Sequence, residues 1–165
     1  MKASDLKGRA VVTLSDAAKV GHVDDVLFDA TYRRVLGFRV KRGMFDHADA
    51  LPRDSVAAVG ADALTVDSPD AINAQERFAD LAGAASLGQV HGTKVVTDGG
   101  TLLGIIAGVE IDEAARRVDS YTLSAPLLDK LRHREDAIRA EDVLRLGEGG
   151  IMIVPDAVGQ TLRDA

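Results

Sequence analysis

Three aspartates close together, Asp24, Asp25 and Asp29, form the densest group of carboxylates in the sequence. Several carboxylate oxygens at close spacing are the ligands that a hard cation such as calcium prefers. The spacing does not match an EF-hand loop, however, and charged residues are mostly solvent-exposed. We therefore predict no metal site here; Asp24 and Asp25 are expected on a solvated strand edge, with Asp29 starting a turn.

The histidines are the next residues that could bind a metal or transfer protons. The sequence contains four of them: His22, His47, His91 and His133. None lies at helical i, i+4 spacing from another, no cysteine is present, and none forms a recognisable catalytic order with serine or a carboxylate. His47, between Asp46 and Asp49, is the best metal or acid–base candidate, although a polar loop is the favoured interpretation. We predict no catalytic residue, no cofactor and no enzymatic activity.

Two pairs of arginines, Arg33–Arg34 and Arg116–Arg117, recur at what look like equivalent turns. Such pairs could contact an anion or an acidic partner. Alternatively, the charges mark hairpin turns and discourage edge pairing between molecules. We favour the second interpretation but keep Arg33 and Arg34 as candidate protein-binding residues.

Large apolar side chains stand in two otherwise polar segments. Met44 and Phe45 lie in a loop with Gly43 and Asp46, and Leu127 and Leu128 lie in a leucine-rich segment. They are expected to cap the ends of the fold. They could instead anchor a partner, because buried methionine and aromatic side chains contribute strongly to binding. Met44, Phe45, Leu127 and Leu128 are therefore candidate protein-binding residues as well.

These residues must be positioned by an internal repeat. The segment that begins at Gly8 aligns with the one that begins at Gly92, so that Gly21 falls on Gly104, Asp29 on Asp112 and Phe38 on Tyr121. The repeat predicts two small lobes. Because a lobe of this size is marginally stable alone, we expect the lobes to pack against each other or against a second copy of the chain, as a homodimer.

Short apolar strands with turn signals between them predict a barrel or sandwich. The Asp24–Asp25 pair interrupts strand alternation and predicts a bulge. Near the end of each repeat, Gly60 aligns with Gly147, and Leu64–Val66 with Ile151–Ile153. Helical spacing predicts a short linking helix over 70–83, and Ser124 with Pro126 predicts a helix over 124–134 that is inserted in the second repeat. The expected boundaries are 1–69 for the first barrel, 70–91 for the helical linker, 92–157 for the second barrel and 158–165 for a C-terminal tail.

The composition excludes several classes of function. The chain has 165 residues, a net charge of -6, no cysteine and 4% aromatic residues. This balance argues against nucleic acid or an anionic membrane as the main partner. No signal peptide or membrane span is visible, so a cytoplasmic location is expected.

The assembled pattern resembles the PRC-barrel family. The resemblance rests on V-G-x-V-x-D-V-x-x-D at residues 20–29, and on Leu51–Pro52 followed by Val56. The second repeat departs from the pattern, with Ala107–Gly108 in place of the Asp24–Asp25 pair and Arg139 in place of Pro52. The resemblance implies a mainly β protein made of two tandem, highly curved barrels that bind other macromolecules. Relatives include the cytoplasmic domain of a photosynthetic reaction-centre subunit and the C-terminal domain of a ribosome maturation factor.

We therefore predict a non-enzymatic adaptor that binds a protein partner through barrel loops and edges, with homodimerisation as a further expectation. One alternative is a ribosome-associated assembly factor that binds a basic ribosomal protein. The other is a small enzyme or metal-binding protein with a cleft between the lobes. Fold does not by itself define function, so the partner has to be inferred from the site.

Overall fold

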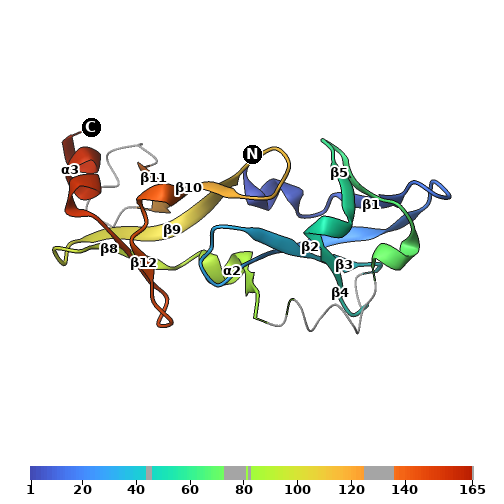
Figure 1. Cartoon of the computed structure of the whole chain (residues 1–165), viewed down its shortest axis with the longest axis horizontal. Coiled ribbons are helices and arrows are strands. Elements are labelled where there is room, and N and C mark those ends of the chain that lie inside the picture. Colours follow the sequence, from blue (N-terminus) through green and yellow to red (C-terminus); the bar gives the residue numbers. More distant parts are fainter. Residues whose placement is uncertain (44–45, 73–80, 82, 125–135, 165) are drawn as a thin grey trace.

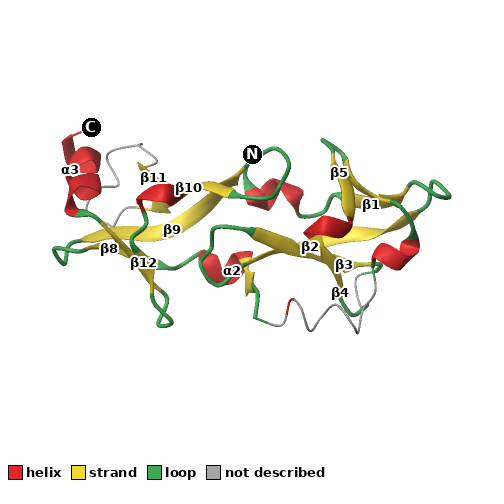
Figure 2. Ribbon diagram, viewed as in Figure 1, coloured by secondary structure: helices red, strands yellow, loops and turns green. Residues whose placement is uncertain are grey.

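The computed structural model describes residues 1–43, 46–72, 81, 83–124 and 136–164. It is an elongated molecule in which two β lobes lie side by side, with the N-terminus near the middle and the C-terminus at the far end of the second lobe (Figure 1). Strands dominate both lobes, and the helices are short (Figure 2). The described helices are η1 (Ala3–Leu6), η2 (Arg53–Ser55), η3 (Pro69–Ala71), α2 (Leu87–Val90), η5 (Ala140–Asp142) and α3 (Asp156–Asp164).

Both lobes have the same strand order, as the repeat predicts. The first sheet runs β4-β3-β2-β1-β6-β5, with β7 paired to β2, and the second runs β11-β10-β9-β8-β13-β12. The strands of the first sheet are β1 (Ala10–Thr13), β2 (Lys19–Phe28), β3 (Val35–Lys41), β4 (Asp49–Pro52), β5 (Val56–Val59), β6 (Ala63–Val66) and β7 (Ala85–Ser86). Those of the second are β8 (Lys94–Thr97), β9 (Leu102–Ile111), β10 (Val118–Ser124), β11 (Asp136–Arg139), β12 (Arg145–Leu146) and β13 (Ile151–Val154). The mainly β, two-lobe prediction is confirmed.

Three bulges recur at equivalent positions in the two lobes. Asp24 is skipped in the β2–β3 register, and Ala107 is skipped in the β9–β10 register. The other two bulges fall on Val20 and Leu36 in the first lobe and on Leu103 and Asp119 in the second. Each bulge bends its strand and increases the local twist, so the long central hairpin of each lobe curves around its core. The bulge predicted at Asp24–Asp25 is confirmed.

Gly21 and Gly104 are both required by close backbone packing. A Cβ on Gly21 would lie 2.6 Å from the carbonyl oxygen of Lys41, and one on Gly104 would lie 2.5 Å from that of Ser124. In each lobe the glycine allows the bent hairpin to approach the next strand, which explains why the repeat keeps it.

The predicted alignment at the end of the repeat is wrong by one residue. In the parallel pairs β1–β6 and β8–β13, Val11 faces Leu64 and Val95 faces Met152. Leu64 is therefore equivalent to Met152, not to Ile151. The cause is one extra residue in the turn of the second lobe: the amide of Gly60 binds the carbonyl of Ala63, whereas that of Gly147 binds the carbonyl of Ile151.

Equivalent side chains fill the two cores. Several matching positions are fully buried in both lobes, among them Val11, Phe28, Phe38, Leu51 and Leu64 in the first, and Val95, Ile111, Tyr121, Ile138 and Met152 in the second. They belong to one hydrophobic cluster that spans both lobes. The lobes therefore share a continuous core.

The repeat begins earlier than Gly8 and Gly92. Met1 exchanges two backbone hydrogen bonds of 2.8 Å with Ile111 on β9 of the second lobe. At the equivalent position of the second repeat, β7 pairs with β2 of the first lobe. Each repeat therefore starts with a short segment that pairs with the other lobe, and the helical turns that follow, η1 and α2, bury Leu6 and Val90.

Much of each predicted helix lies outside the described residues. Of the segment 70–83, the structure describes the end of η3, then Ile72, Leu81 and Gly83. Ser124 is the last residue of β10, and residues 125–134 of the other predicted helix lie outside the described residues. The C-terminal segment forms α3, in which Gly159 is buried against Thr97 and Leu103 of the second lobe.

Candidate binding site at the seam between the barrels

Two equivalent turns meet where the lobes join, and we call this region the seam. In the first, the Asp29 carboxylate accepts hydrogen bonds from the backbone amides of Arg33 (2.9 Å) and Arg34 (3.1 Å). In the second, Asp112 accepts the same bonds from Arg116 (2.6 Å) and Arg117 (2.9 Å). Aspartate recurs here because a short carboxylate can satisfy the backbone of its own turn.

The two turns are joined by their backbones. The amide of Val35 donates to the carbonyl of Arg116 (3.0 Å), and the amide of Val118 donates to the carbonyl of Arg33 (2.9 Å). These bonds flank an antiparallel bridge between Arg34 and Arg117. The seam is therefore a short strand pairing between lobes, which fixes how they are placed relative to each other.

Side chains tie the seam differently on its two sides. On one side, the buried Tyr121 hydroxyl donates to the Tyr32 carbonyl (2.7 Å), and Arg33 Nη2 donates to the Val143 carbonyl (2.7 Å). Burial raises the pKa of Tyr121, so its phenol stays neutral. Because Phe38 stands where Tyr121 stands in the repeat, the first lobe cannot make the matching bond.

On the other side of the seam, Arg53 makes the connection. Its Nε and Nη2 donate to the Ala114 carbonyl in the second lobe (2.8 and 2.6 Å), and Nη1 donates to the Val56 carbonyl (3.1 Å). Arg53 is buried, with 7% of its surface exposed, and forms no salt bridge with any described residue. Burial, and then the charge of Arg116, lower the pKa of Arg53. The hydrogen bonds of this buried cation in the described residues thus all go to backbone carbonyls, while Asp54 and Asp112 attract it from nearby.

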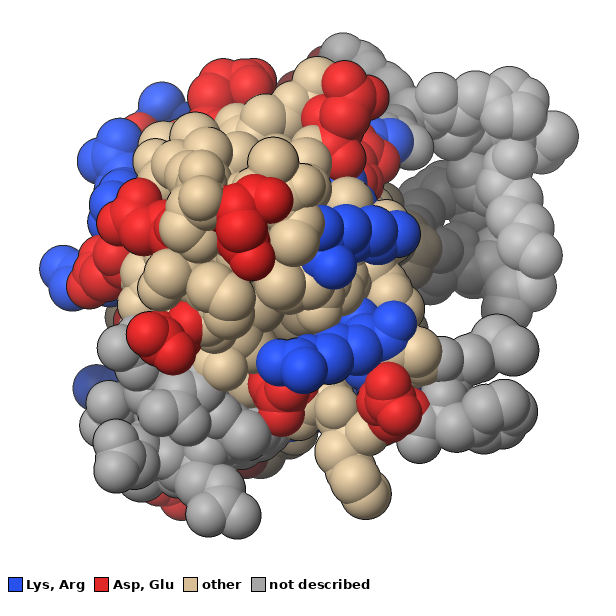
Figure 3. Space-filling view, turned by 90° about the vertical axis from the view of Figure 1, so that its right-hand side faces the viewer, with Lys and Arg blue, Asp and Glu red and all other residues tan. Residues whose placement is uncertain are grey.

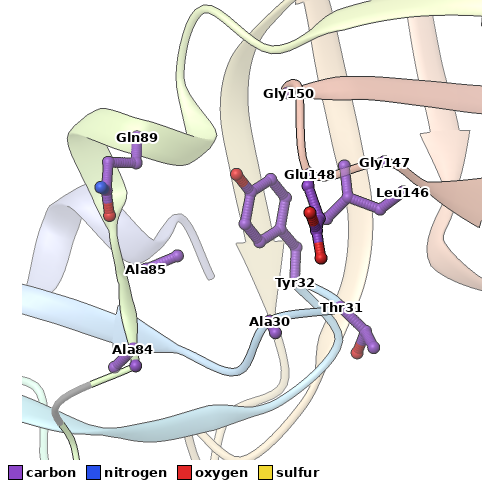
Figure 4. Close-up of a pocket in the computed structure, with 11 residues that line it drawn as sticks. Ala30, Thr31, Tyr32, Ala84, Ala85, Gln89, Leu146, Gly147, Glu148 and Gly150 are labelled. Carbon is purple, nitrogen blue, oxygen red and sulfur yellow. The ribbon is translucent and has the colours of Figure 1, made fainter.

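A groove of about 600 Å³ opens on one side of the seam, and we call it the seam groove. Figure 4 shows the Tyr32 ring standing between Gln89 of α2 and Glu148 of the β12–β13 turn. The walls come from both lobes and from the segment that leads into the second repeat. The lining residues are Ala30, Thr31, Tyr32, Gly83, Ala84, Ala85, Gln89, Leu146, Gly147, Glu148 and Gly150.

A second, smaller pocket of about 380 Å³ gathers arginines at the seam, and we call it the arginine pocket. Its lining comprises Arg34, Val35, Leu36, Arg53, Asp54, Asp112, Arg116 and Arg117. Arg116 pairs with Asp54 (3.1 Å). Burial raises the pKa of Asp112, but hydrogen bonds from the backbone amides of Arg117 and Arg116 outweigh it and leave that pKa lowered. Both carboxylates of the pocket are therefore occupied.

The predicted binding residues divide between the seam and the undescribed part of the chain. Arg33 and Arg34 lie in the seam, where Arg33 binds a carbonyl of the second lobe and Arg34 lines the arginine pocket. Their role in binding a partner stays a prediction. Met44, Phe45, Leu127 and Leu128 lie outside the described residues.

The three aspartates Asp24, Asp25 and Asp29 do not form one cluster in the structure. Asp24 pairs with Lys41 (3.4 Å), and Asp25 lies 3.9 Å from Lys7 while accepting the backbone amides of Val26 and Leu87. Asp29 belongs to the seam turn, so the three carboxylates have different partners. Within the described ranges, no three histidine or acidic side chains are grouped so as to hold a metal ion.

Two of the predicted histidines differ sharply in environment. His47 is exposed and lines neither the seam groove nor the arginine pocket. His91 is half-buried, and burial, followed by the nearby charge of Lys7, lowers its pKa. His22 lies on β2, and His133 is outside the described residues.

Three residues of the seam were not singled out from the sequence: Tyr32, Arg53 and Glu148. Tyr32 has a left-handed backbone with φ of 59°, as does the equivalent Ala115 with φ of 51°. An aromatic residue at a position where the repeat has alanine was a detectable signal. Arg53 and Glu148 carry no such signal, because each is one charged residue among many.

Charge is distributed differently at the seam and at the end of the first lobe. Figure 3 shows that end, where acidic and basic side chains are interspersed among uncharged residues. The arginine pocket instead collects four guanidinium groups around two carboxylates. No helix in the described part of the chain is long and apolar enough to cross a membrane.

Comparison with known proteins agrees with the repeat. Residues 1–72 match the family model of the PRC-barrel domain. No curated protein matches the sequence. Among solved structures, the chain is similar to one described as a 16S ribosomal RNA processing protein, RimM, from Pseudomonas aeruginosa, at 17% identity and a TM-score of 0.32, covering 91% of this chain and 95% of that chain. A TM-score this low carries nothing about function. Residues 1–72 therefore match the PRC-barrel domain, and the second half of the chain repeats their strand order.

Proposed function

We propose that this chain is a protein-binding module that accepts an extended segment of a partner protein in the seam groove. The observation that carries the proposal is Tyr32. The left-handed turn itself is needed in both lobes, but alanine suffices for it in the second lobe, where Ala115 is buried. The aromatic ring at Tyr32 is thus not required by the turn. Aromatic anchors at the centre of a pocket commonly dominate binding energy.

The edge of β12 supports an extended ligand. This strand is the last in the order of its sheet and pairs only with β13 among the described strands. Its Leu146 lines the groove, and the glycine-rich turn that follows exposes backbone there. An unpaired strand edge offers amide and carbonyl groups to an incoming strand, which is a recurring mode of peptide binding.

Charge favours a basic partner segment at this groove. Glu148 is exposed on the groove wall, and the chain carries a net charge of -6. The Tyr32 hydroxyl forms no hydrogen bond within the described part of the chain, so it remains able to donate to or accept from a ligand. The fitting ligand is therefore an extended segment with a basic or amide side chain beside the Tyr32 ring.

We also propose binding rather than catalysis at the seam. Asp29 and Asp112 accept backbone hydrogen bonds that hold their own turns. The Tyr121 phenol is buried and already donates to the Tyr32 carbonyl. The hydrogen bonds of these three titratable side chains are thus made within the protein and hold its fold. Acid–base chemistry would need a group within reach of a bound substrate and a pKa near the working pH.

Site-specific photo-crosslinking in cells tests the groove. We expect a photoreactive residue at Glu148 to give one dominant protein adduct, whereas one at Asp62, in the equivalent turn of the first lobe, should not. Adding Tyr32→Ala, which copies Ala115, should reduce the Glu148 adduct at least about tenfold, since losing an anchor costs about 2 kcal/mol or more. Equal adducts at the two positions, or an adduct insensitive to Tyr32→Ala, would contradict the proposal.

Homodimerisation stays a prediction. The seam already pairs two lobes within one chain through backbone bonds and a shared core. Each lobe therefore already buries apolar surface against the other lobe of the same chain, which is the gain that a dimer of single lobes would provide. Light scattering at micromolar concentration distinguishes the two cases, and a monomer would remove the dimer from the proposal.

A further inference from the structure

The backbone of the seam forces two arginines to face each other. The hydrogen bonds on either side of Arg34 and Arg117 make them a non-hydrogen-bonded antiparallel pair. In such a pair the side chains project to the same face, and their Cβ atoms lie about 4.5–5.5 Å apart. Like charges placed directly opposite each other are destabilising.

Neither arginine of this pair forms a salt bridge with a described residue. Both side chains are exposed, and within the described residues neither forms a salt bridge or a side-chain hydrogen bond. Both line the arginine pocket, together with Arg53 and Arg116. The charge of Arg117 acts on Asp112, whose pKa it helps to lower, but no carboxylate of the described residues pairs directly with either arginine.

Arg53, the buried arginine of the pocket, also has N–H donors that are not used. A guanidinium has five N–H donors, and the printed bonds of Arg53 use three of its nitrogens once each, on the carbonyls of Ala114 and Val56. Two N–H groups therefore remain without a partner in the described residues. The repulsive effect of Arg116 on Arg53 shows that the positive charges in this pocket act on one another.

We propose that the arginine pocket binds a doubly charged oxyanion of the phosphate type, a function separate from the seam groove. The pocket holds four guanidinium groups against two carboxylates, which leaves two positive charges for the ligand to neutralise. Asp54 pairs with Arg116, and Asp112 accepts the backbone amides of Arg116 and Arg117, so neither carboxylate forms a salt bridge with the side chain of Arg34 or Arg117. Planar guanidinium forks match phosphate oxygens, and such charge-assisted bonds are the strong ones.

Titration of the full chain with inorganic phosphate, followed by amide NMR, tests the site. At about pH 8, where the phosphate group is mainly doubly charged, we expect saturable shifts centred on the amides of Val35, Arg116 and Arg117. Acetate at equal ionic strength should give shifts at least about tenfold weaker in affinity. Shifts centred elsewhere in the chain, or acetate binding as tightly as phosphate, would overturn the proposal.

A matched pair of double variants isolates the facing arginines. R34Q/R117Q should weaken phosphate binding at least about tenfold, because it removes the two free guanidinium groups. R42Q/R163Q removes the same net charge from exposed positions outside the pocket and should leave the affinity within about twofold. Equal weakening by both variants would mean a general charge effect and would sink the site. If R34Q/R117Q failed to fold, the position of the wild-type shifts would still decide.

The source of the phosphate group is resolved by a second ligand. A short phosphoserine peptide is compared with inorganic phosphate and with its unphosphorylated form, all on the full chain. Tighter binding of the phosphopeptide than of inorganic phosphate assigns the site to a phosphorylated protein. Equal affinities assign it to a free anion, and binding of the unphosphorylated peptide at the same strength contradicts an oxyanion site.

Discussion

Replacing Leu6 with alanine is expected to lower the free energy of unfolding of the whole chain by about 2–5 kcal/mol. Leu6 is fully buried, in the helical turn that follows the N-terminal pairing with β9. Its side chain belongs to the core cluster that contains residues of both lobes. Removing it leaves a cavity at the place where the lobes are joined, and a well-packed core relaxes only partly around a cavity.

The same variant tests whether the lobes unfold as one unit. Because each repeat begins with a segment paired to the other lobe, we expect a single denaturant-induced transition in the wild type and in Leu6→Ala, with the midpoint shifted and the slope retained. Leu14→Ala is the matched control, since 59% of Leu14 is exposed; it should change stability by less than about 0.5 kcal/mol. Two separate transitions, with only one shifted by Leu6→Ala, would show that the lobes are independent.

The repeat allowed the two lobes and most of their strands to be predicted. Strand patterns, turn glycines and the interruption at Asp24 are local signals, and each has a physical cause that the structure displays: a bulge at Asp24 and close backbone packing at Gly21. The error at Leu64 arose from one extra residue in a turn. Turn length has no strong signature when several glycines are adjacent, and a slip of one residue changes the face of every side chain that follows.

The pairing between the lobes could not be predicted by the same means. The bond between Met1 and Ile111 joins residues 110 positions apart, and the N-terminal segment has no strand pattern of its own. The arginine pairs were recognised as repeated, but their meeting at one bridge depends on how two turns are placed in space. Arg53 gains its role only from the carbonyls that the seam brings to it.

Replacing Tyr121 with phenylalanine is expected to destabilise the chain by about 1–3 kcal/mol at neutral pH. The ring should still fit, because Phe38 fills the equivalent place in the first lobe. The variant loses the hydrogen bond from the hydroxyl to the Tyr32 carbonyl. Leaving a partly buried carbonyl without a partner lowers the free energy of unfolding by about 1–3 kcal/mol. Tyr32→Phe is the control, since its hydroxyl bonds to no described residue, and it should leave the denaturation midpoint nearly unchanged.

The difference between wild type and Tyr121→Phe should shrink as the pH rises above about 10. Burial raises the pKa of Tyr121 above the ordinary value of 10.0, so the unfolded chain releases this proton at lower pH than the folded chain does. The stability that Tyr121 contributes is therefore complete below that ordinary value and is lost as the pH climbs beyond it. Urea denaturation of both proteins between about pH 7 and pH 11 measures the effect. Equal stabilities at neutral pH, or a difference that grows in alkali, would show that the Tyr121 hydroxyl does not bridge the two barrels.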